Sequence, residues 1–417
     1  MKQLRLSRLA VLLAAIGFCA VPELTTIAGN TAYAQEAMRP EIGKVVQAAG
    51  ELFKAKKYKD ALAKIHETDS VSGKTVNENF TIERMRAAIA SAAGDNDTVI
   101  RSYEAIISAN KLPAGEQLKY VQGLASAYYK AGNYAKTTQW VKRYYTDGGS
   151  DPAMRPFLIQ SMYMSGDYSG TMKEVRSDLA AEEKSGRAPS ETSLQLYANA
   201  ALKQNDKATY VAAIEKLLTY YPKKDYWIDL LGRIQSKPGY SERLSLNLYR
   251  LKFALGQITR TNDFMEMSQL SLQAGYPAEA IKIIEQGYKA GALGTGTEAE
   301  RHKRLRDLAN KNLAESKASA TANETEASQS KDGTGLVNLG YGYVTAGQAD
   351  KGLKMIEQGI AKGELKRPDD VKLLQGIALI EAGKKSNAIK VLKTVQGTDG
   401  TADLARYWII YANQSGK

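Results

Sequence analysis

A small or polar turn residue recurs between two helix-like segments at intervals of 34 to 39 residues along this chain. The two clearest copies are AYYKAGNYAKTTQWV around Gly132 and QSMYMSGDYSGTMKEV around Gly166. One helix pair cannot bury its apolar face alone, so a period of this length predicts that successive pairs stack on one another. The repeat therefore favours a binding scaffold, and it does not identify what the scaffold binds.

Aligning the chain on this turn gives the number of repeats. The gap from Gly275 to Gly347 is 72 residues, twice 36, which predicts a degenerate repeat with its turn near Lys311. About ten helix pairs result, and a last helix from Thr401 to about Gln414 is expected to cap the stack. The predicted fold is an all-α solenoid of about ten helix-turn-helix repeats with a C-terminal capping helix. The aligned turn residues are Lys56, Gly94, Gly132, Gly166, Asn205, Gly239, Gly275, Gly347 and Gly383.

Apolar periodicity within each unit predicts how its helices pack. In the first helix of the unit that begins at Leu118, the spacing i, i+3, i+4, i+7 is filled by Val121, Leu124, Ala125 and Tyr128, which places one face inward. Second helices carry a small residue followed four positions later by a large apolar one. The small residue lets two helix backbones approach, and the large one fills the groove beside it. Three such pairs are Ala61 and Ile65, Ala280 and Ile284, and Gly352 and Ile356.

These motifs resemble the tetratricopeptide repeat (TPR) family, whose pattern places an aromatic residue, Leu-Gly, Tyr, Ala and Pro across 34 residues. The segment VNLGYGYVTAGQADKGLKMIEQGIAKG supplies Leu339, Gly340 and Tyr343, with Gly352 where the family prefers Ala. GNYAKTTQWV supplies a further glycine, tyrosine and tryptophan. The resemblance covers most of residues 42–395, and the unit at 333–368 also has some Sel1-like character. It implies a right-handed α-solenoid that binds protein or peptide partners and is not an enzyme.

The same resemblance implies where a partner would bind. First helices line the concave side of TPR arrays, and carried over position by position this surface is polar and mildly basic. It suits an extended peptide or a glycan with some negative charge. We expect Tyr129 and Tyr163 to contact the ligand, the alternative being that both pack in the core. The implied groove residues are Lys119, Gln122, Ser126, Tyr129, Lys130, Gln160, Tyr163, Gln195, Asn199 and Lys203.

The N-terminus has the pattern of a secretory signal peptide. Lys2, Arg5 and Arg8 precede an apolar run at 9–21, and Ala32-Tyr33-Ala34 follows as a small-x-small cleavage site. The apolar run is shorter than the roughly 20 residues of a membrane-spanning helix, so no transmembrane anchor is expected after cleavage. We therefore predict removal of residues 1–34 and a periplasmic location, with secretion as the alternative. The only cysteine, Cys19, lies in the removed part.

The chain carries a formal charge of +12. In an exported protein this charge favours anionic envelope partners over nucleic acid. Binding of peptidoglycan, polysaccharide or anionic lipid is therefore an alternative to binding of proteins. A third interpretation is that the excess lysine only solvates helix faces.

Signals for catalysis are weak, and we expect no catalytic residues, no metal site and no cofactor. His66 and His302 stand in different units without HExxH spacing, and both are expected on helix surfaces. The phosphate-loop-like sequence at 72–75 lacks the leading glycine and a preceding strand. Gly294-Thr295-Gly296 could cradle an anion, although a loop before a helix N-cap explains it more simply.

One segment, AESKASATANETEASQSKDGTG at 314–335, has almost no large apolar residue. It is either a flexible linker between solenoid parts at 35–313 and 336–417, or a poorly packed second helix of the degenerate repeat. The alanine content and the doubled spacing favour the helix. We expect this segment to be more mobile than the rest of the array.

Overall fold

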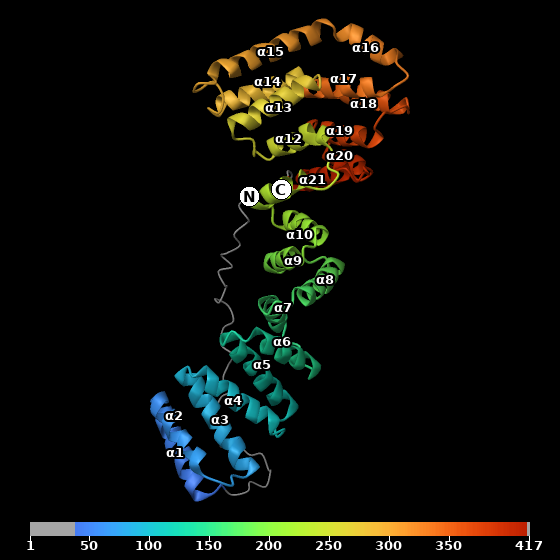
Figure 1. Cartoon of the computed structure of the whole chain (residues 1–417). Helices are drawn as coiled ribbons and strands as arrows, with labels where there is room; N and C mark the ends of the chain where they lie inside the picture. Colours follow the sequence, from blue (N-terminus) through green and yellow to red (C-terminus); the bar gives the residue numbers. More distant parts are fainter. Residues whose placement is uncertain (1–37, 415–417) are drawn as a thin grey trace. The chain divides into compact units, whose positions relative to one another are not determined.

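The computed structural model describes residues 38–414, and every regular element in that range is a helix (Figure 1). The predicted signal peptide and Cys19 lie outside the described residues. The described helices form ten consecutive pairs followed by one last helix, so the all-α repeat fold is confirmed. Among the described residues, no helix combines the length and the apolar character needed to cross a membrane.

The first helices are α1 (Pro40–Lys54), α2 (Tyr58–His66), α3 (Val76–Ala93), α4 (Asn96–Ser108), α5 (Ala114–Lys130), α6 (Tyr134–Thr146), α7 (Met154–Met164), α8 (Tyr168–Ser185), α9 (Glu191–Lys203) and α10 (Lys207–Tyr220). The later ones are α11 (Lys224–Ile234), α12 (Ser245–Ala254), α13 (Thr261–Gln273), α14 (Pro277–Lys289), α15 (Ala299–Ala318), α16 (Ala320–Gln329), α17 (Thr334–Thr345), α18 (Ala349–Ala361), α19 (Pro368–Glu381), α20 (Lys385–Leu392) and α21 (Thr401–Gln414).

The described residues divide into two compact units, the first up to Tyr210 and the second from Val211, so the division falls inside α10. The first unit is a stack of helix pairs in chain order. The second unit holds the remaining pairs and the last helix. Each unit has its own buried core.

All nine aligned turn residues have a positive φ, from 56° at Asn205 to 84° at Gly166. Side chains with a Cβ rarely adopt this left-handed conformation, which explains why seven of the nine are glycine. The turn positions predicted from the sequence are therefore confirmed at each of these nine places.

In three helix pairs of the first unit, the residue after the turn caps the second helix. Asp95, Asn133 and Asp167 each accept a hydrogen bond from a backbone N–H in the first turn of α4, α6 and α8, at 2.8 to 3.1 Å. Such a cap satisfies one of the N–H groups that a helix start leaves unpaired. The turn thus combines a left-handed residue that ends one helix with a polar residue that begins the next.

The small-and-large pairs of the second helices are buried as predicted. Ala61, Ile65, Ala280, Ile284 and Ile356 are each 0% exposed. Helices α17 and α18 approach closely, because a Cβ on Gly352 would lie 2.4 Å from the carbonyl oxygen of Gly340. This explains why glycine stands where the TPR pattern prefers alanine, because the two helices leave no room for a methyl group.

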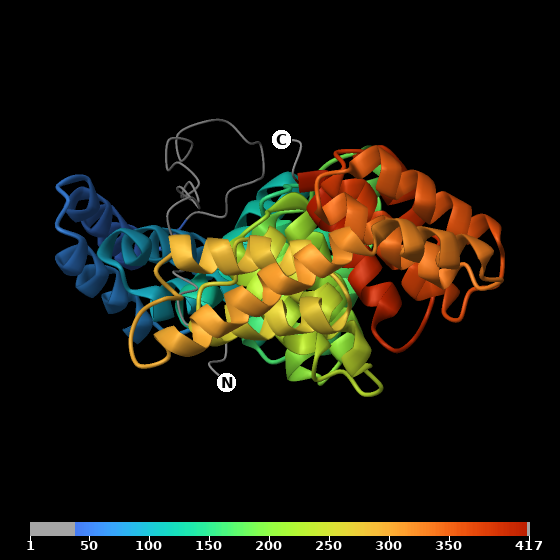
Figure 2. The same cartoon turned by 90° about the horizontal axis from the view of Figure 1, so that it is seen from above.

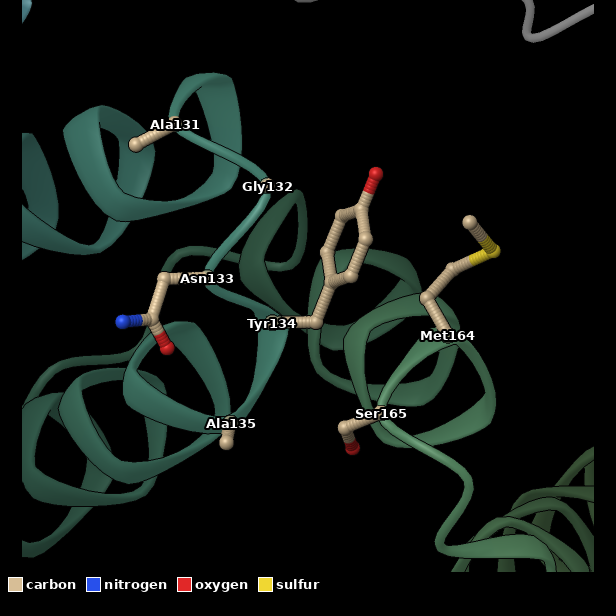
Figure 3. Close-up of a pocket in the computed structure, with 7 residues that line it drawn as sticks. All are labelled: Ala131, Gly132, Asn133, Tyr134, Ala135, Met164 and Ser165. Carbon is tan, nitrogen blue, oxygen red and sulfur yellow. The ribbon is translucent and has the colours of Figure 1, made fainter.

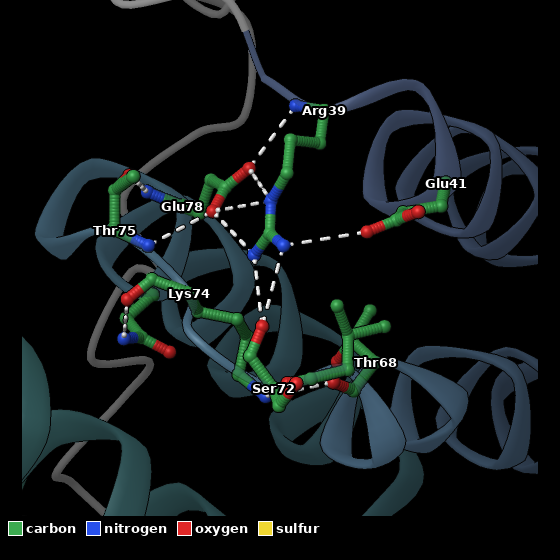
Figure 4. Close-up of polar contacts among 9 residues, drawn as sticks. Arg39, Glu41, Thr68, Ser72, Lys74, Thr75 and Glu78 are labelled. Carbon is green, nitrogen blue, oxygen red and sulfur yellow. Dashed lines mark hydrogen bonds and ion pairs between the residues drawn. The ribbon is translucent and has the colours of Figure 1, made fainter.

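The first repeat is held by a polar network around Glu78 (Figure 4). Arg39, which precedes α1, donates to Glu78 from both its backbone N–H and its guanidinium group, each at 3.0 Å. Glu78 also accepts from the backbone N–H of Thr75, and the Thr75 hydroxyl accepts from the N–H of Glu78, which forms a capping box at the start of α3. The network therefore ties the start of α1 to the start of α3.

This network makes the stability of the first repeat depend on pH. Hydrogen bonds from Arg39 and Thr75 lower the pKa of Glu78 from 4.5 to about 2. The unfolded chain therefore binds a proton at a higher pH than the folded chain does, so the stabilisation is complete above about pH 4.5 and is lost as the pH falls towards 2. Glu78→Gln should weaken the first repeat at pH 7 and flatten this dependence, which hydrogen exchange of α1 and α3 amides can follow. An unchanged pH profile in the variant would contradict the assignment.

The degenerate repeat is helical, but its turn is not near Lys311. Helix α15 runs through that residue to Ala318, and the break before α16 is at Ser319. The distance of 72 residues from Gly275 to Gly347 still includes one extra helix pair, because a 20-residue helix is followed by one of 10 residues. Helix α16 buries only Ala327, in agreement with the missing apolar stripe. In Figures 1 and 2, α15 lies along α14 and α13, and α16 continues beside α17.

The prediction for one histidine is wrong. His302 is 2% exposed, and its Nδ1 accepts a hydrogen bond of 3.1 Å from the backbone N–H of Gly294. The glycine loop at 294–296 therefore donates that N–H to the protein itself and does not offer it to an anion. His66 is half-exposed on α2, where its Nδ1 lies 3.0 Å from Asp69.

Helix α21 packs on α19 and α20 and also contacts α12, which lies near the start of the second unit in the sequence. The Gln414 side chain accepts from the Trp227 indole at 3.2 Å and donates to the backbone of Leu218 at 2.7 Å. Arg243, before α12, forms ion pairs with Asp370 and Asp399 at 2.8 and 2.7 Å. The last helix thus caps the final pair, as predicted, and in addition closes the second unit on itself.

Candidate functional site

Equivalent positions on the first helices α5, α7 and α9 form two rows of partly exposed side chains. Three residues before each turn stand Tyr129, Tyr163 and Leu202, here called the apolar row. Both tyrosines are half-buried and Leu202 is 49% exposed. All three helices belong to the first unit.

The two tyrosines of the apolar row are held by neighbouring rings. The Tyr129 ring centroid lies 4.5 Å from that of Phe157 on α7 and 5.3 Å from that of Tyr134 on α6. Tyr163 has the same relation to Tyr168 on α8, at 5.4 Å. Tyr129 therefore packs between two successive helix pairs and contributes to their contact. The sequence did not indicate this role. A ring fixed in this way loses little side-chain entropy when a ligand contacts it.

The hydroxyl groups of the two tyrosines remain available. Among the described residues, neither Tyr129 nor Tyr163 makes a hydrogen bond through its hydroxyl. Partial burial raises the pKa of each above the usual 10, so both are neutral at physiological pH. Each can then donate or accept a hydrogen bond to a ligand that covers the ring.

The second row lies two residues before each turn and consists of Lys130, Met164 and Lys203, here called the mixed row. Met164 is 48% exposed, and both lysines are exposed. Within residues 38–414, neither lysine of this row forms an ion pair. The mixed row therefore alternates a cation, a flexible apolar side chain and a second cation along the stack.

The polar residues of the predicted groove differ in the hydrogen bonds and the burial of their side chains. Gln122 donates from its side-chain amide to Asp151 at 2.9 Å, which joins α5 to the segment before α7. Ser126 donates back to the carbonyl of Gln122 at 3.0 Å, so its hydroxyl serves its own helix. Gln160 and Asn199 are half-buried at the position equivalent to Ser126, six residues before their turns.

The remaining predicted residues lie further along the same helices. Lys119 is exposed towards the start of α5, and Gln195 is half-buried on α9. Whether these side chains bind a ligand stays a prediction. The structure places the predicted residues on α5, α7 and α9, and it makes Gln122 a structural bridge as well.

A shallow hollow of about 410 Å³ lies beside the two rows, where the turn after α5 faces the end of α7 (Figure 3). One side is formed by the turn at 131–133 and the start of α6, and the Tyr134 ring extends from it towards Met164. Met164 and Ser165 at the end of α7 form the other side. The hollow can receive a side chain of a ligand that lies along the rows.

Leu202 and Met164 were missed by the sequence analysis. Leu202 occupies the position of Tyr129 and Tyr163 when the units are aligned on their turns, and Met164 occupies that of Lys130 and Lys203. The alignment therefore contained the signal, but apolar residues were not considered as ligand contacts.

The paired helices, the left-handed turn residues and the Leu339-Gly340-Tyr343 motif at the close crossing of α17 and α18 together define the repeat type. The fold is a tetratricopeptide-type array of helix pairs. Its handedness as a superhelix over the full length stays a prediction.

Comparisons with known proteins found similar solved structures but no relative by sequence. No family model matches the chain, and no curated protein matches it by sequence. One similar solved structure is the TPR2AB domain of yeast Sti1 in a complex with pHSP90, at 11% identity over 72% of this chain and 99% of that one, with a TM-score of 0.24. Another is yeast Tom70, at 11% identity over 90% and 96%, with a TM-score of 0.25. At these TM-scores the superpositions carry no argument, so nothing about partners is carried over.

Proposed function

We propose that this chain is an exported, non-catalytic scaffold that binds an extended segment of a partner protein across α5, α7 and α9 of its first unit. The observation that carries the proposal is the apolar row. Single exposed apolar residues are ordinary on a protein surface. Three of them at equivalent positions on successive first helices form a periodic surface, which an extended chain can match with its own side chains.

The charges of the two rows indicate the kind of segment. Lys130 and Lys203 are exposed and directly follow Tyr129 and Leu202 of the apolar row, and Lys119 is exposed nearer the start of α5. Acidic residues next to apolar ones in the partner would pair with these lysines while apolar side chains cover Tyr129 and Tyr163. We therefore propose an extended segment that combines apolar and acidic residues as the ligand.

The proposed location is the periplasm, and it rests on the N-terminal sequence. The basic residues, the apolar run and Ala32-Tyr33-Ala34 are the features that support export. Edman sequencing of the mature protein from the envelope fraction should start at Gln35. Recovery of the chain with residues 1–34 intact would contradict export by this route.

The partner can be captured from the proposed surface. A photo-crosslinking residue at Gln160, which lies three residues before Tyr163 on α7, should capture one partner segment. The same residue at Lys173, exposed on the second helix α8, should not capture it. The captured segment is then synthesised and its affinity measured. Equal capture from Gln160 and Lys173 would contradict the proposed surface.

Substitutions in the apolar row should weaken binding of that synthetic segment. Tyr129→Ala with Tyr163→Ala should cost about 1–3 kcal/mol of binding free energy, because both rings are held ready for contact. Leu202→Ser is the cleaner test, since a side chain that is 49% exposed contributes little to stability. Tyr128→Ala is the matched control, because Tyr128 is buried and should cost stability instead. If the double variant binds normally but melts early, the two tyrosines are core residues only.

The alternative partner, an anionic polymer of the envelope, is favoured by the charge of +12. Its affinity would fall steeply as salt rises, because each charge contact is screened. The affinity for such a polymer should also stay unchanged in Leu202→Ser. A partner segment held by the apolar row shows the opposite pattern.

A further inference from the structure

The second unit contains a cavity of about 590 Å³ that is separate from the two rows. It lies among α12, α13, α17 and the start of α19, and its size is in the range of about 300–1,000 Å³ that small-molecule sites occupy. One side is apolar, with Leu246, Leu270 and Leu374 among its residues. The cavity therefore offers an apolar body of a ligand a place to be buried.

The floor of the cavity is a buried guanidinium group. Arg250 is 6% exposed and forms a two-bond ion pair with Glu279, at 2.7 and 2.8 Å. The rings of Tyr341 and Tyr276 lie over it, with centroids 4.3 and 5.0 Å from its central carbon. Burying charges costs free energy unless they are paired, and such pairs are often less stabilising than apolar packing. A cluster of this kind beside a cavity is a candidate for a ligand site.

Hydrogen bonds hold the Arg250 guanidinium group in place beside the cavity. Glu279 and Asn247 take three of the five N–H groups of Arg250, at 2.7 to 2.8 Å.

The rim of the cavity is cationic. Four basic and two acidic side chains line the cavity as a whole. Arg243 is already paired with Asp370 and Asp399. Lys366 is 81% exposed and lies 3.5 Å from Asp332, a pair that solvent weakens. Arg367 is exposed and has no ion pair among the described residues. Two cations at the rim are therefore available to an anion.

We propose that this cavity binds a small amphipathic organic anion, with its apolar body against Leu246, Leu270 and Leu374 and its anionic head at Arg367 and Lys366. The site is independent of the partner-binding rows of the first unit. A carboxylate and a phosphate monoester share this chemistry, because guanidinium and ammonium groups bind both. The head group is therefore distinguished by experiment.

The test uses octanoate, octyl phosphate and the neutral octanamide as probes, below the concentrations at which they aggregate. Isothermal titration of the full mature chain should show one saturable site for octanoate or octyl phosphate, and the stronger of the two identifies the head group. Octanamide should bind at least about tenfold more weakly, because it lacks the charge. Equal binding of octanamide, or no binding of either anion, would overturn the proposal.

Variants locate the site and keep the test independent of folding. Lys366→Gln with Arg367→Gln removes two exposed rim charges and should weaken the anion by about tenfold or more. Lys390→Gln with Lys393→Gln removes the same charge from exposed residues near the end of α20 and should change nothing. Ala274→Trp, at an exposed residue that lines the cavity, should abolish binding by filling it. Unchanged binding in Ala274→Trp would place the anion elsewhere and contradict the proposal.

Discussion

Glu279→Gln should lower the free energy of unfolding of the second unit by about 3–5 kcal/mol, because it leaves the Arg250 guanidinium buried without its counter-charge. The side chains of Arg250 and Glu279 are almost fully buried, at 5% and 7% exposed, so solvent cannot replace the lost carboxylate. The amide NH2 of Gln would also face the Nη2 donor of Arg250, which now donates to Oε2 of Glu279 at 2.8 Å. The effect should therefore be among the largest of any single substitution in this unit.

The measurement needs a signal from the second unit alone. Trp140 lies in the first unit, whereas Trp227 and Trp408 lie in the second, so urea unfolding followed by tryptophan fluorescence in a Trp140→Phe background reports on the second unit. The matched control is Glu298→Gln, which removes the partner of Arg301 in an ion pair whose two side chains are each 57% exposed. That variant should change stability by less than about 0.5 kcal/mol. Similar losses in the two variants would show that Arg250 is not buried as described.

Gly352→Ala should destabilise the same unit by about 1–3 kcal/mol, against the general rule for glycine in a helix. Alanine is normally better than glycine in a helix interior, by roughly 1 kcal/mol. Here its Cβ would lie 2.4 Å from the carbonyl oxygen of Gly340 and 2.8 Å from the backbone nitrogen of Val344. Backbone atoms cannot move aside as a flexible side chain can, so α17 and α18 would be forced apart.

Gly232→Ala is the matched control for this prediction. Gly232 is exposed within α11 of the same unit, and no atom lies within 4 Å of the position its Cβ would take. This variant should raise stability by about 0.5–1 kcal/mol. The same urea unfolding should therefore show a lower free energy of unfolding for Gly352→Ala and a higher one for Gly232→Ala. A stabilising Gly352→Ala would mean that the two helices do not cross as closely as described.

Local signals explain which parts of the fold could be predicted from the sequence. A left-handed turn residue such as Gly132 or Gly166 is set by its own backbone conformation, so the alignment of turns located them without knowledge of the rest. The turn of the degenerate repeat was placed at Lys311 because the spacing was divided evenly. Helix α15 instead continues to Ala318, and no glycine marks its end.

Contacts between separate segments explain what the sequence could not reveal. His302 is 2% exposed and accepts from the backbone N–H of Gly294 in the loop before α15, and no sequence motif indicates this contact. The cavity of the second unit depends on Arg250 meeting Glu279 and Tyr341, which come from three different helices. The apolar row lies between these two cases. Its member Leu202 can be found from the alignment of turns, but its exposure cannot.

Hydrogen exchange of the full mature chain, with and without the captured partner segment, tests the proposed scaffold most directly. The segment should slow exchange in α5, α7 and α9, towards the ends that carry Tyr129, Tyr163 and Leu202, because covering these residues suppresses local opening of those helices. The second helices α6 and α8 should change less. Protection confined to α6 and α8, or to the second unit, would contradict the account.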